Sequence, residues 1–307
     1  MKQVVLIGNS FGVSGYASHI RQLALALHEK GVEVKIECPK QAGWEMTVSD
    51  QELLMHNRQT QNDAIGILIG QPPFLPLFWA DNYSDVIPFV IWEGSRCPSY
   101  WLPFLMDKRV KQIWSPSKHT ADAIINTAKT KSQKKQLADK IRIVPHGVDL
   151  AIFNGQKTEE VRPFRLIANK GWRGSQKDRG GVAYLLQAYV QEFRKTDSIE
   201  LLLKINPAYC HQGWNIEDEI AKIGIQKDKN NPILKVTSAM LDMKAMSEIY
   251  NGDVFVTSSM SDAFNIPVIE AAAMELPSIA TNFGGQTDFV NTKNGWLVGG
   301  KLTPVTW

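Results

Sequence analysis

Residues 253–281 read DVFVTSSMSDAFNIPVIEAAAMELPSIAT, and this stretch contains the repeating unit from which the fold can be predicted. The valine-rich run 253–258 is typical of a buried strand, and the alanine-rich run 267–275 is typical of a helix. Pro267 suits the first turn of that helix, and a second apolar run follows at 277–281. A strand, a helix and a strand in this order predict two parallel strands joined by a crossover helix.

The same alternation continues along the rest of the chain. Short apolar runs bounded by glycine, proline or polar turns predict strands at 4–8, 32–38, 64–70, 86–92, 111–117, 140–145, 163–169, 199–205, 233–238, 253–258 and 277–281. Amphipathic runs predict helices at 16–30, 181–194, 242–250 and 267–275. Alternating strands and helices are typical of parallel sheets with helices on both faces, so we predict the α/β fold class.

The strands form two sets, which predict two Rossmann-like domains. The chain has 307 residues, enough for two ordinary domains. A polar stretch at 153–163 joins the sets, so the expected domains are residues 1–155 and 156–307. In open α/β sheets, ligands bind beyond the carboxyl ends of the strands, and the functional residues are therefore expected in the loops that follow strands.

Composition excludes several classes of protein. The three cysteines are widely spaced and form no CxxC pattern, which disfavours a disulfide framework or a zinc site and favours a reducing, cytoplasmic location. The first apolar run stops at Gly8, which is too short for a signal peptide, and no run of about 18 apolar residues occurs. A net charge of +3 is too small to indicate nucleic-acid binding by itself.

The first candidate loop is GNSFGVSGYASH at 8–19, between the first strand and the first helix. Its glycines let the backbone approach a phosphate, and the helix that follows presents free N–H groups. The spacing is GxxxGxxG rather than the dinucleotide pattern GxGxxG. Glu37 ends the second strand, where a ribose-binding acid would belong, so a nicotinamide-dependent oxidoreductase is one alternative. An ordinary strand-to-helix turn is another.

The second candidate loop lies within 167–189 and is basic. It follows a strand, carries Lys170, Arg173, Lys177 and Arg179, and leads into an amphipathic helix. Guanidinium groups bind phosphate oxygens in pairs and keep their charge at any working pH, so this loop is suited to a diphosphate. A solvated basic loop is the alternative interpretation.

The third candidate loop is the segment from Asp262 to Glu270. The two carboxylates do not share one helical face, which disfavours an acid–base pair of the hydrolase type. We expect the loop to wrap a polar ligand, with Asp262 at one end, the backbone N–H groups of Phe264, Asn265 and Ile266 at its middle, and Glu270 accepting hydroxyls at the other end.

These motifs together resemble the retaining GT-B glycosyltransferases of family 4, also called glycosyl transferases group 1. The segments that carry the resemblance are SGYASHIRQLALALHEKGVEV (14–34), PFVIWEGSRCPSYW (88–101), WSPSKHTADAI (114–124), IRIVPHGVDLAIF (141–153), NKGWRGSQKDRGGVAYLLQAY (169–189) and DAFNIPVIEAAAMELPSIATNFGGQTDFV (262–290). They occur in the family's order over most of the chain. The resemblance implies two parallel sheets that face a central cleft, with the acceptor side in the first domain and the nucleotide-sugar donor in the second.

Carried over to this chain, the resemblance implies a role for each matching residue. Glu270 would hold the ribose, and Asp262 would contact hydroxyls of the donor sugar. Phe264, Asn265 and Ile266 would line the donor. For the diphosphate, the resemblance names Arg173 and Arg179 as its ligands, Lys177 as the alternative to Arg179, and Gly15 as the residue that lets the first loop close onto it.

The chain departs from the family pattern at several positions. Asp262 stands where the family has glutamate, and Ala263 and Asn265 replace two glycines, which narrows the room beside the sugar. The strand end that often supplies a histidine to the sugar here carries Glu93, a candidate for sugar or acceptor contact. The chain stops at NGWLVGGKLTPVTW, so the crossover helices with which the family usually ends are expected to be absent.

The expected reaction moves a sugar from a UDP- or GDP-linked donor to an acceptor hydroxyl, with retention of configuration by resemblance. The chain has no DxD motif and the acidic run 217–219 is assigned no role, so we expect neither a metal nor any other cofactor. Two alternatives to this function are the oxidoreductase and a non-catalytic sugar-nucleotide-binding relative.

The acceptor is left open between a glycan, a lipid-linked sugar, a protein and a modified nucleic-acid base, and no obligate protein partner is inferred. The stretch 129–142 carries six cations and one acid. It is interpreted as a solvated helix face, with peripheral contact to an anionic membrane or to a phosphate-rich acceptor as the alternatives.

Overall fold

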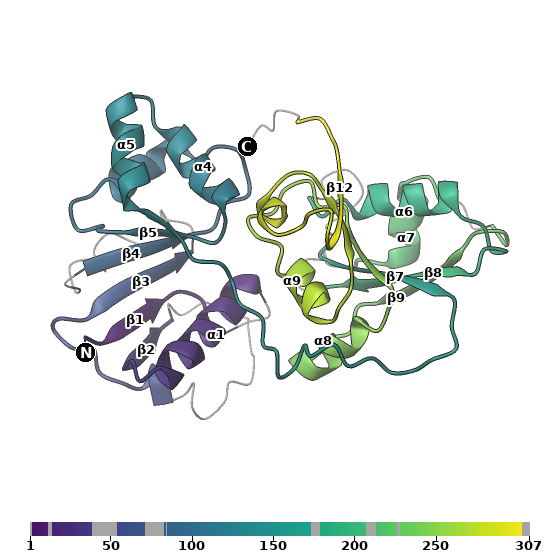
Figure 1. Ribbon diagram of the computed structural model, residues 1–307, viewed down its shortest axis with the longest axis horizontal. Helices are drawn as coiled ribbons and strands as arrows, with labels where there is room; N and C mark the ends of the chain where they lie inside the picture. The colour runs from purple at the N-terminus through teal and green to yellow at the C-terminus, as the bar shows by residue number, and fades with distance from the viewer. Residues whose placement is uncertain are drawn as a thin grey trace. The chain divides into compact units, whose positions relative to one another are not determined.

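The computed structural model describes residues 2–11, 14–38, 54–70, 83, 85–172, 179–206, 213–225 and 228–302 (Figure 1). The chain divides into two compact units, Met1–Gly147 and Val148–Trp307. The sequence places the division at 155/156, whereas the contacts place it earlier, because the residues that follow Gly147 pack on the second unit. Phe153, for example, is fully buried in a core cluster of that unit.

The first unit is built around one parallel sheet. Its strands are β1 (Val4–Ile7), β2 (Val34–Glu37), β3 (Ile65–Gly70), β4 (Asp85–Val90), β5 (Ile113–Ser115) and β6 (Ile141–Ile143), in the order β2-β1-β3-β4-β5-β6. Its helices are α1 (Gly15–Glu29), a 3-10 turn (Ser99–Trp101), α3 (Leu102–Leu105), α4 (Lys118–Thr127) and α5 (Lys131–Lys140). Helices cover both faces of the sheet: α1 lies against β2 and β3, and residues of α3, α4 and α5 form a core cluster with residues of β1, β3 and β4.

The second unit contains a second six-stranded parallel sheet. Its strands are β7 (Phe164–Lys170), β8 (Ile199–Ile205), β9 (Ile233–Thr237), β10 (Val254–Thr257), β11 (Ser278–Thr281) and β12 (Gly295–Val298), in the order β12-β11-β10-β7-β8-β9. Its helices are α6 (Val182–Glu192), α7 (Ile216–Lys222), α8 (Met243–Ile249), α9 (Ile266–Ala273) and a 3-10 turn (Gly285–Asp288). The predicted α/β fold class with two Rossmann-like parallel sheets is confirmed.

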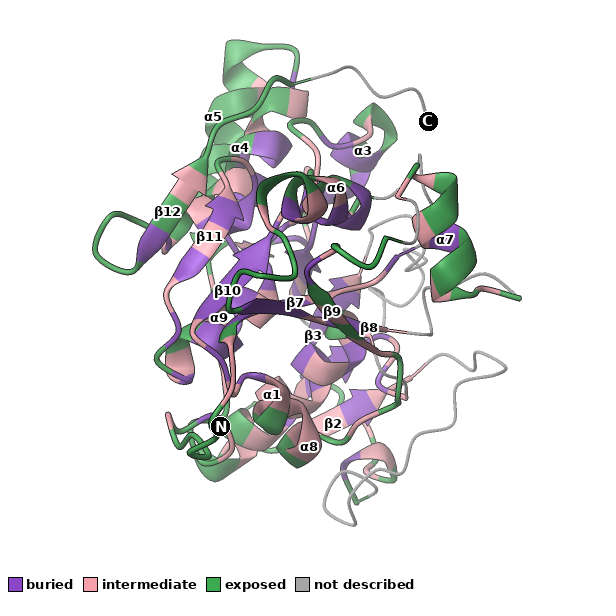
Figure 2. Ribbon diagram, turned by 90° about the vertical axis from the view of Figure 1, so that its right-hand side faces the viewer, coloured by how far each residue is buried: buried purple, intermediate pink, exposed green. Residues whose placement is uncertain are grey.

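Side chains of β7 alternate between two hydrophobic clusters, one on each face of this sheet. Ala168 packs in the cluster formed with α6 and α7, whereas Ile167 packs in the cluster formed with α8 and α9. Successive residues of a strand point to opposite faces, so a strand covered on both sides needs apolar residues on both faces, as at the centre of β7. In Figure 2 the central strands β7 and β10 are accordingly buried, while the outer side of α7 is exposed.

The strand order of the second sheet determines where its functional edge lies. From β7 the chain winds outward through β8 and β9, and from β10 it winds outward in the opposite direction through β11 and β12. The neighbours β7 and β10 therefore form the topological switch point, where the loops at their carboxyl ends diverge and ligands of such sheets bind.

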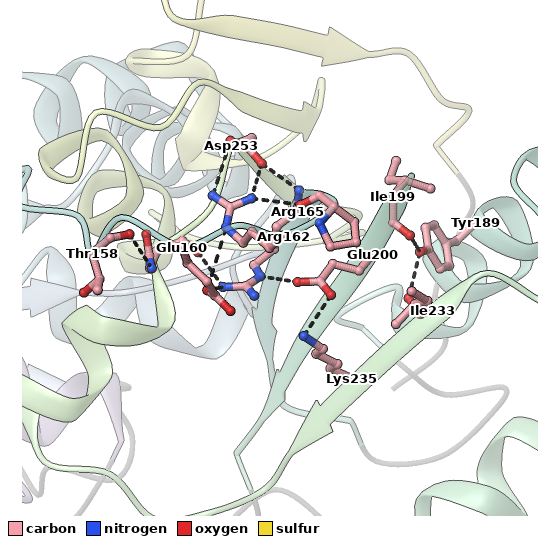
Figure 3. A network of polar contacts seen from close by, with 12 residues as sticks. Thr158, Glu160, Arg162, Arg165, Tyr189, Ile199, Glu200, Ile233, Lys235 and Asp253 are labelled. Carbon is pink, nitrogen blue, oxygen red and sulfur yellow. Dashed lines mark hydrogen bonds and ion pairs between the residues drawn. The ribbon is translucent and has the colours of Figure 1, made fainter. Parts of the chain in front are cut away.

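A network of charged side chains holds the start of the second unit to the amino ends of its strands (Figure 3). The guanidinium of Arg162 donates to Asp253, which precedes β10, at 2.5 Å. Arg165 Nε donates to Glu200 Oε1 at 2.5 Å, and Lys235 Nζ lies 2.8 Å from Glu200 Oε2. These contacts join β7, β8 and β9 near the amino ends of the strands. Ligands of such sheets bind at the opposite, carboxyl ends, so we assign a stabilising role to these contacts.

Candidate functional site

A lysine at the end of β7 connects the two central strands at the switch point. Lys170 Nζ donates to Asp262 Oδ2 at 3.0 Å and to Asn265 Oδ1 at 2.9 Å. The side chain of Lys170 is 11% exposed and that of Asp262 is 24% exposed, so the ion pair is shielded from solvent but can be reached from the surface. The basic residue and the acidic loop, which sequence analysis treated as separate candidates, therefore meet in one place.

The loop that follows β10 is folded around the carboxylate of Asp262. Asp262 Oδ1 accepts hydrogen bonds from the backbone N–H groups of Phe264 at 3.2 Å and Asn265 at 2.7 Å. Two of the three N–H groups expected to meet a ligand are thus bonded to Asp262 in this structure. Ile266, the third, is the first residue of α9.

Asn265 adopts a left-handed backbone conformation with φ of 73° immediately before α9. Glycine and asparagine are the residues that tolerate this conformation best, which accounts for asparagine at a position where the related family carries glycine. The side chain is buried, and its amide nitrogen donates to Thr257 Oγ1 at 3.2 Å. Asn265 is therefore turned into the protein and does not crowd a ligand with its amide group.

The charges around Asp262 keep it ionised. Burial acts to raise the pKa of this carboxyl, but the positive charges of Lys170 and Arg179 and the hydrogen bonds from Lys170 and the Phe264 backbone outweigh burial and lower the pKa below its ordinary value. Asp262 is thus a carboxylate at neutral pH, able to accept further hydrogen bonds from hydroxyl groups.

The loop before α6 packs directly against the loop after β10. Met260 N–H donates to the carbonyl of Arg179 at 2.9 Å, and the Arg179 guanidinium donates to the carbonyl of Ser261 at 3.1 Å. Gly181 has a φ of 70°, and a Cβ there would lie 2.1 Å from the carbonyl oxygen of Ser258, so no other residue fits. This contact brings Arg179 beside Asp262, while Arg173 and Lys177 lie outside the described residues.

Glu270 lies in α9 as predicted and is buried, with 8% of its surface exposed. Its Oε2 accepts a hydrogen bond from the hydroxyl of Tyr250 at 2.5 Å, and Asn169 Nδ2 donates to the same hydroxyl at 3.3 Å. Burial raises the pKa of Glu270 to about 7, although the hydrogen bond from Tyr250 lowers it. Adjacent residues of β7 are thus linked to both acids of the third loop: Lys170 to Asp262, and Asn169 through Tyr250 to Glu270.

Two predicted site residues, Gly15 and Glu93, belong to the first unit. They lie beyond the carboxyl ends of its strands. Gly15 is the first residue of α1, which Ser14 caps by accepting a hydrogen bond from the Ala17 backbone at 3.3 Å. Glu93 follows β4, and its carbonyl lies 2.8 Å from His119 Nε2. Roles for Gly15 and Glu93 at a donor or acceptor remain predictions.

Glu37, on which the oxidoreductase alternative depends, is at the end of β2 as expected. Its carboxylate accepts a hydrogen bond from the hydroxyl of Tyr83 at 2.6 Å. The acid therefore has a partner within the protein, which weakens its assignment as a ribose ligand.

The described part of the chain contains neither a membrane-spanning helix nor a cluster of metal ligands. None of its helices is both long and apolar enough to cross a membrane. No group of three or more His, Cys, Asp and Glu side chains is placed to hold a metal ion in those same ranges.

Tyr250 and Asn169 are members of this site that the sequence does not predict, and Lys170 is predicted only as part of the basic loop. Tyr250 and Asn169 carry no signal, because a buried tyrosine after a helix and an asparagine at a strand end are common structural residues. Lys170 was recognised only as one cation of a loop, although its place at a strand end was a signal that it belonged to the switch point.

The second unit is similar to known glycosyl transferases. Residues 172–304 match the family model of Glycosyl transferases group 1. Among curated proteins, a probable sucrose-phosphate synthase of Thermosipho melanesiensis is 25% identical over 169 residues, which are 53% of this chain and 37% of that protein. The match therefore spans well under half the length of that relative.

Solved structures of the same architecture cover nearly the whole chain. The sucrose-phosphate synthase of Thermosynechococcus elongatus has a TM-score of 0.65 and 15% identity, over 97% of this chain and 86% of its own. HepE of Anabaena, solved in complex with UDP, has a TM-score of 0.63 and 14% identity, over 97% of this chain and 85% of its own. At these identities the likeness establishes the fold. Residues 172–304 are therefore similar to the group 1 glycosyl transferases, and the two units have the Rossmann-like parallel sheets of the GT-B fold.

Proposed function

We propose that this protein is a glycosyltransferase that moves a sugar from a nucleotide-diphosphate sugar to an acceptor hydroxyl, with retention of configuration and without a metal. One observation carries the proposal. Lys170, Arg179 and Asp262 meet at the switch point of the second sheet, next to the start of α9, and Arg179 and Asp262 lie within the residues that match the family model. Cations beside a hydroxyl-accepting carboxylate suit a ligand that carries both phosphate and sugar.

The chemistry follows from charge. When the bond between sugar and diphosphate breaks, negative charge develops on the leaving group, and fixed cations lower the barrier by stabilising it. Arg179 is placed for this task, and Arg173 and Lys177 are assigned to it on sequence grounds. The N-terminus of α9, which begins with the N–H of Ile266, adds a partial positive charge. With this set of charges the departure of the diphosphate needs no metal ion.

Asp262 and Glu270 have different tasks in this proposal. Asp262 is ionised and accepts hydroxyl hydrogen bonds from the transferred sugar, while Lys170 keeps the carboxylate in place. Glu270 accepts the hydroxyls of the ribose. In a retaining transfer the acceptor oxygen attacks from the face that the diphosphate leaves, so the leaving group itself can take up the acceptor proton.

The relatives guide the choice of donor. HepE was solved with UDP, and two of the similar proteins are described as sucrose-phosphate synthases. UDP-sugars are therefore the first donors to test, and GDP-sugars the second. The acceptor is a glycan, a lipid-linked sugar, a protein or a modified base, and exposed cations of α5 would let the first unit contact an anionic membrane carrying such an acceptor.

The experiment measures nucleoside diphosphate release from UDP-glucose, UDP-N-acetylglucosamine, GDP-mannose and ADP-glucose, with and without simple acceptors and with EDTA present throughout. Release from one donor that survives EDTA, with NMR of the product showing the donor's anomeric configuration, supports the whole proposal. If EDTA abolishes the release of nucleoside diphosphate, only the proposal that no metal is needed would be contradicted. Tight binding of UDP or GDP without turnover would instead favour the non-catalytic relative, and saturable binding of NADH would favour the oxidoreductase.

A further inference from the structure

A buried chain of hydrogen bonds leads from β7 to Glu270. Asn169 Nδ2 lies 3.3 Å from the hydroxyl oxygen of Tyr250, and that hydroxyl lies 2.5 Å from Glu270 Oε2. Asn169 is the residue before Lys170 in β7, Tyr250 follows α8, and Glu270 lies in α9. The three side chains thus come from β7, from the end of α8 and from α9.

The chemistry of the three groups determines the direction of each hydrogen bond. An amide nitrogen only donates, so the hydroxyl oxygen of Tyr250 accepts from Asn169. The hydroxyl has a single proton, which is therefore donated to Glu270 Oε2. Hydrogen bonds to an ionised acceptor are roughly twice as strong as neutral ones, so this contact favours the carboxylate form of Glu270.

Tyr250 is closely packed on several sides. Its side chain is fully buried, and its ring packs against Phe153 and Phe255 with ring centres 5.8 Å apart in each case. Asn169 Nδ2 also lies 3.7 Å from Met246 Sδ, which fixes the amide from the side of α8. Close packing of this kind restricts rotamers, so the hydroxyl is held at one place before any ligand arrives.

We propose that Tyr250 is a positioning residue for nucleotide binding: its hydroxyl holds Oε2 of Glu270, so that Oε1 of an ionised carboxylate remains to accept the hydroxyls of a ribose. The proposal rests on the function proposed above. Among the described residues no group donates to Oε1 of Glu270. One oxygen is thus oriented by the protein and the other is left for the ligand.

Protonation of Glu270 makes the proposal testable. Burial raises the pKa of Glu270 to about 7, and the Tyr250 hydroxyl opposes that rise. In the described residues Tyr250 is the titratable group that contacts this carboxyl; Asn169 from β7 is uncharged and reaches Glu270 only through Tyr250. Without the hydroxyl the pKa rises further, and a protonated carboxyl is a poorer acceptor for two hydroxyls at once.

The experiment compares UDP binding by the full chain from pH 5.5 to 9, with GDP and ADP in parallel. In wild type, affinity should fall as the pH drops below about 7, because Glu270 takes a proton. In Tyr250→Phe the midpoint of that fall should move up by about one pH unit, the size expected for one lost hydrogen bond to a charged group. The preference for UDP over 2′-deoxy-UDP, about tenfold for one such bond, should shrink.

Two further variants control for folding. Tyr189→Phe removes a buried hydroxyl that donates to the Ile233 carbonyl at 2.8 Å, at the opposite side of the sheet from α9. It should lower the melting temperature and leave the binding midpoint unchanged. Asn169→Ala weakens Tyr250 as a donor without touching Glu270, and should move the midpoint in the same direction as Tyr250→Phe by a smaller amount, so the proposal can be judged even if Tyr250→Phe does not fold.

The outcomes separate the two proposals. If wild type binds UDP with a midpoint near pH 7 but both variants keep that midpoint and the wild-type preference for UDP over 2′-deoxy-UDP, the role of Tyr250 is overturned while the proposed function stands. If wild type binds none of the three nucleoside diphosphates, the proposed function fails, and the positioning role fails with it.

Discussion

Lys170 Nζ lies 3.0 Å from Asp262 Oδ2, so the last residue of β7 neutralises an acid in the loop between β10 and α9. Lys170 ends β7, and Asp262 lies in the loop that follows β10, the neighbouring central strand of the second sheet. A mostly buried ion pair of this kind is held by its partner groups, and removing either one leaves a charge without compensation. The pair therefore links the stability of the second unit to the charge of the proposed donor site.

We expect Lys170→Met to impair both properties. Stability should fall by about 2–4 kcal/mol, because Asp262 loses its main partner in a shielded position. The pKa of Asp262 should rise without Lys170, so donor turnover should fall more at the acid end of the pH range than at the alkaline end. Urea denaturation and turnover from pH 5.5 to 9 check both effects.

The control is Lys135→Met, which breaks an exposed pair between Lys135 and Asp139 and should cost less than 1 kcal/mol. The double variant Lys170→Met with Asp262→Asn should be more stable than the sum of the single changes, because the uncompensated charge is gone. Simple additivity would show that the two side chains act independently.

Arg179→Ala should lower turnover by about 100-fold with a smaller change in donor affinity, since the guanidinium is proposed to stabilise charge that develops as the diphosphate leaves. Steady-state kinetics with the best donor measure both quantities. Arg142→Ala, which removes an exposed guanidinium in the first unit, is the matched control. On sequence grounds Arg173→Ala should behave like Arg179→Ala; wild-type rates in both would refute the diphosphate assignment.

Glu270→Gln should change how stability depends on pH in the absence of ligand. The pKa of Glu270 lies near 7 in the folded chain and near 4.5 when unfolded, so the folded state holds the proton more tightly. Wild type should therefore lose about 3 kcal/mol relative to Glu270→Gln between pH 4.5 and 7, with equal stability restored at lower pH.

Urea denaturation at pH 4, 6 and 8 measures this difference, with Glu248→Gln, an exposed change in α8, as the control. Parallel curves for wild type and Glu270→Gln would mean that the carboxyl is not buried in the way described. The same Glu270→Gln variant should bind UDP more weakly at pH 8, so its gain in stability and its loss of affinity have one physical origin.

Glu200→Gln should destabilise the second unit without changing nucleotide binding. Glu200 is buried between Arg165 and Lys235 (Figure 3). Burial favours its neutral form, but hydrogen bonds from Lys235 and Arg165 outweigh burial and lower its pKa. Its contribution is present above about pH 4.5 and is lost as the pH falls.

The expected loss is about 3 kcal/mol at pH 7, because two cations are left without a partner, and it should shrink in acid. Thermal denaturation at pH 7 and pH 4 measures the loss, and UDP titration of the same samples measures binding. A changed affinity for UDP would show that the amino ends and the carboxyl ends of the strands in the second sheet are energetically coupled.

Much of the fold follows from local patterns. The runs at 199–205 and 64–70 are predicted as strands and are strands, because a parallel strand covered on both faces is mostly apolar. Strand β12 was missed, because Gly295–Val298 is short and half of its residues are exposed, which is typical of an edge strand. The order of strands in each sheet was not predicted, since it depends on contacts between residues far apart in the chain.

The sequence by itself determined the fold class, the family resemblance and the acids Asp262 and Glu270, because each of these is recorded in short runs and in spacings along the chain. Only the tertiary structure decided that Lys170 neutralises Asp262, and that hydrogen bonds connect Asn169 through Tyr250 to Glu270. The physical reason is that an ion pair or a hydrogen bond joins side chains whose distance depends on the packing of β7, β10 and α9, and that packing leaves no pattern in the residues between them.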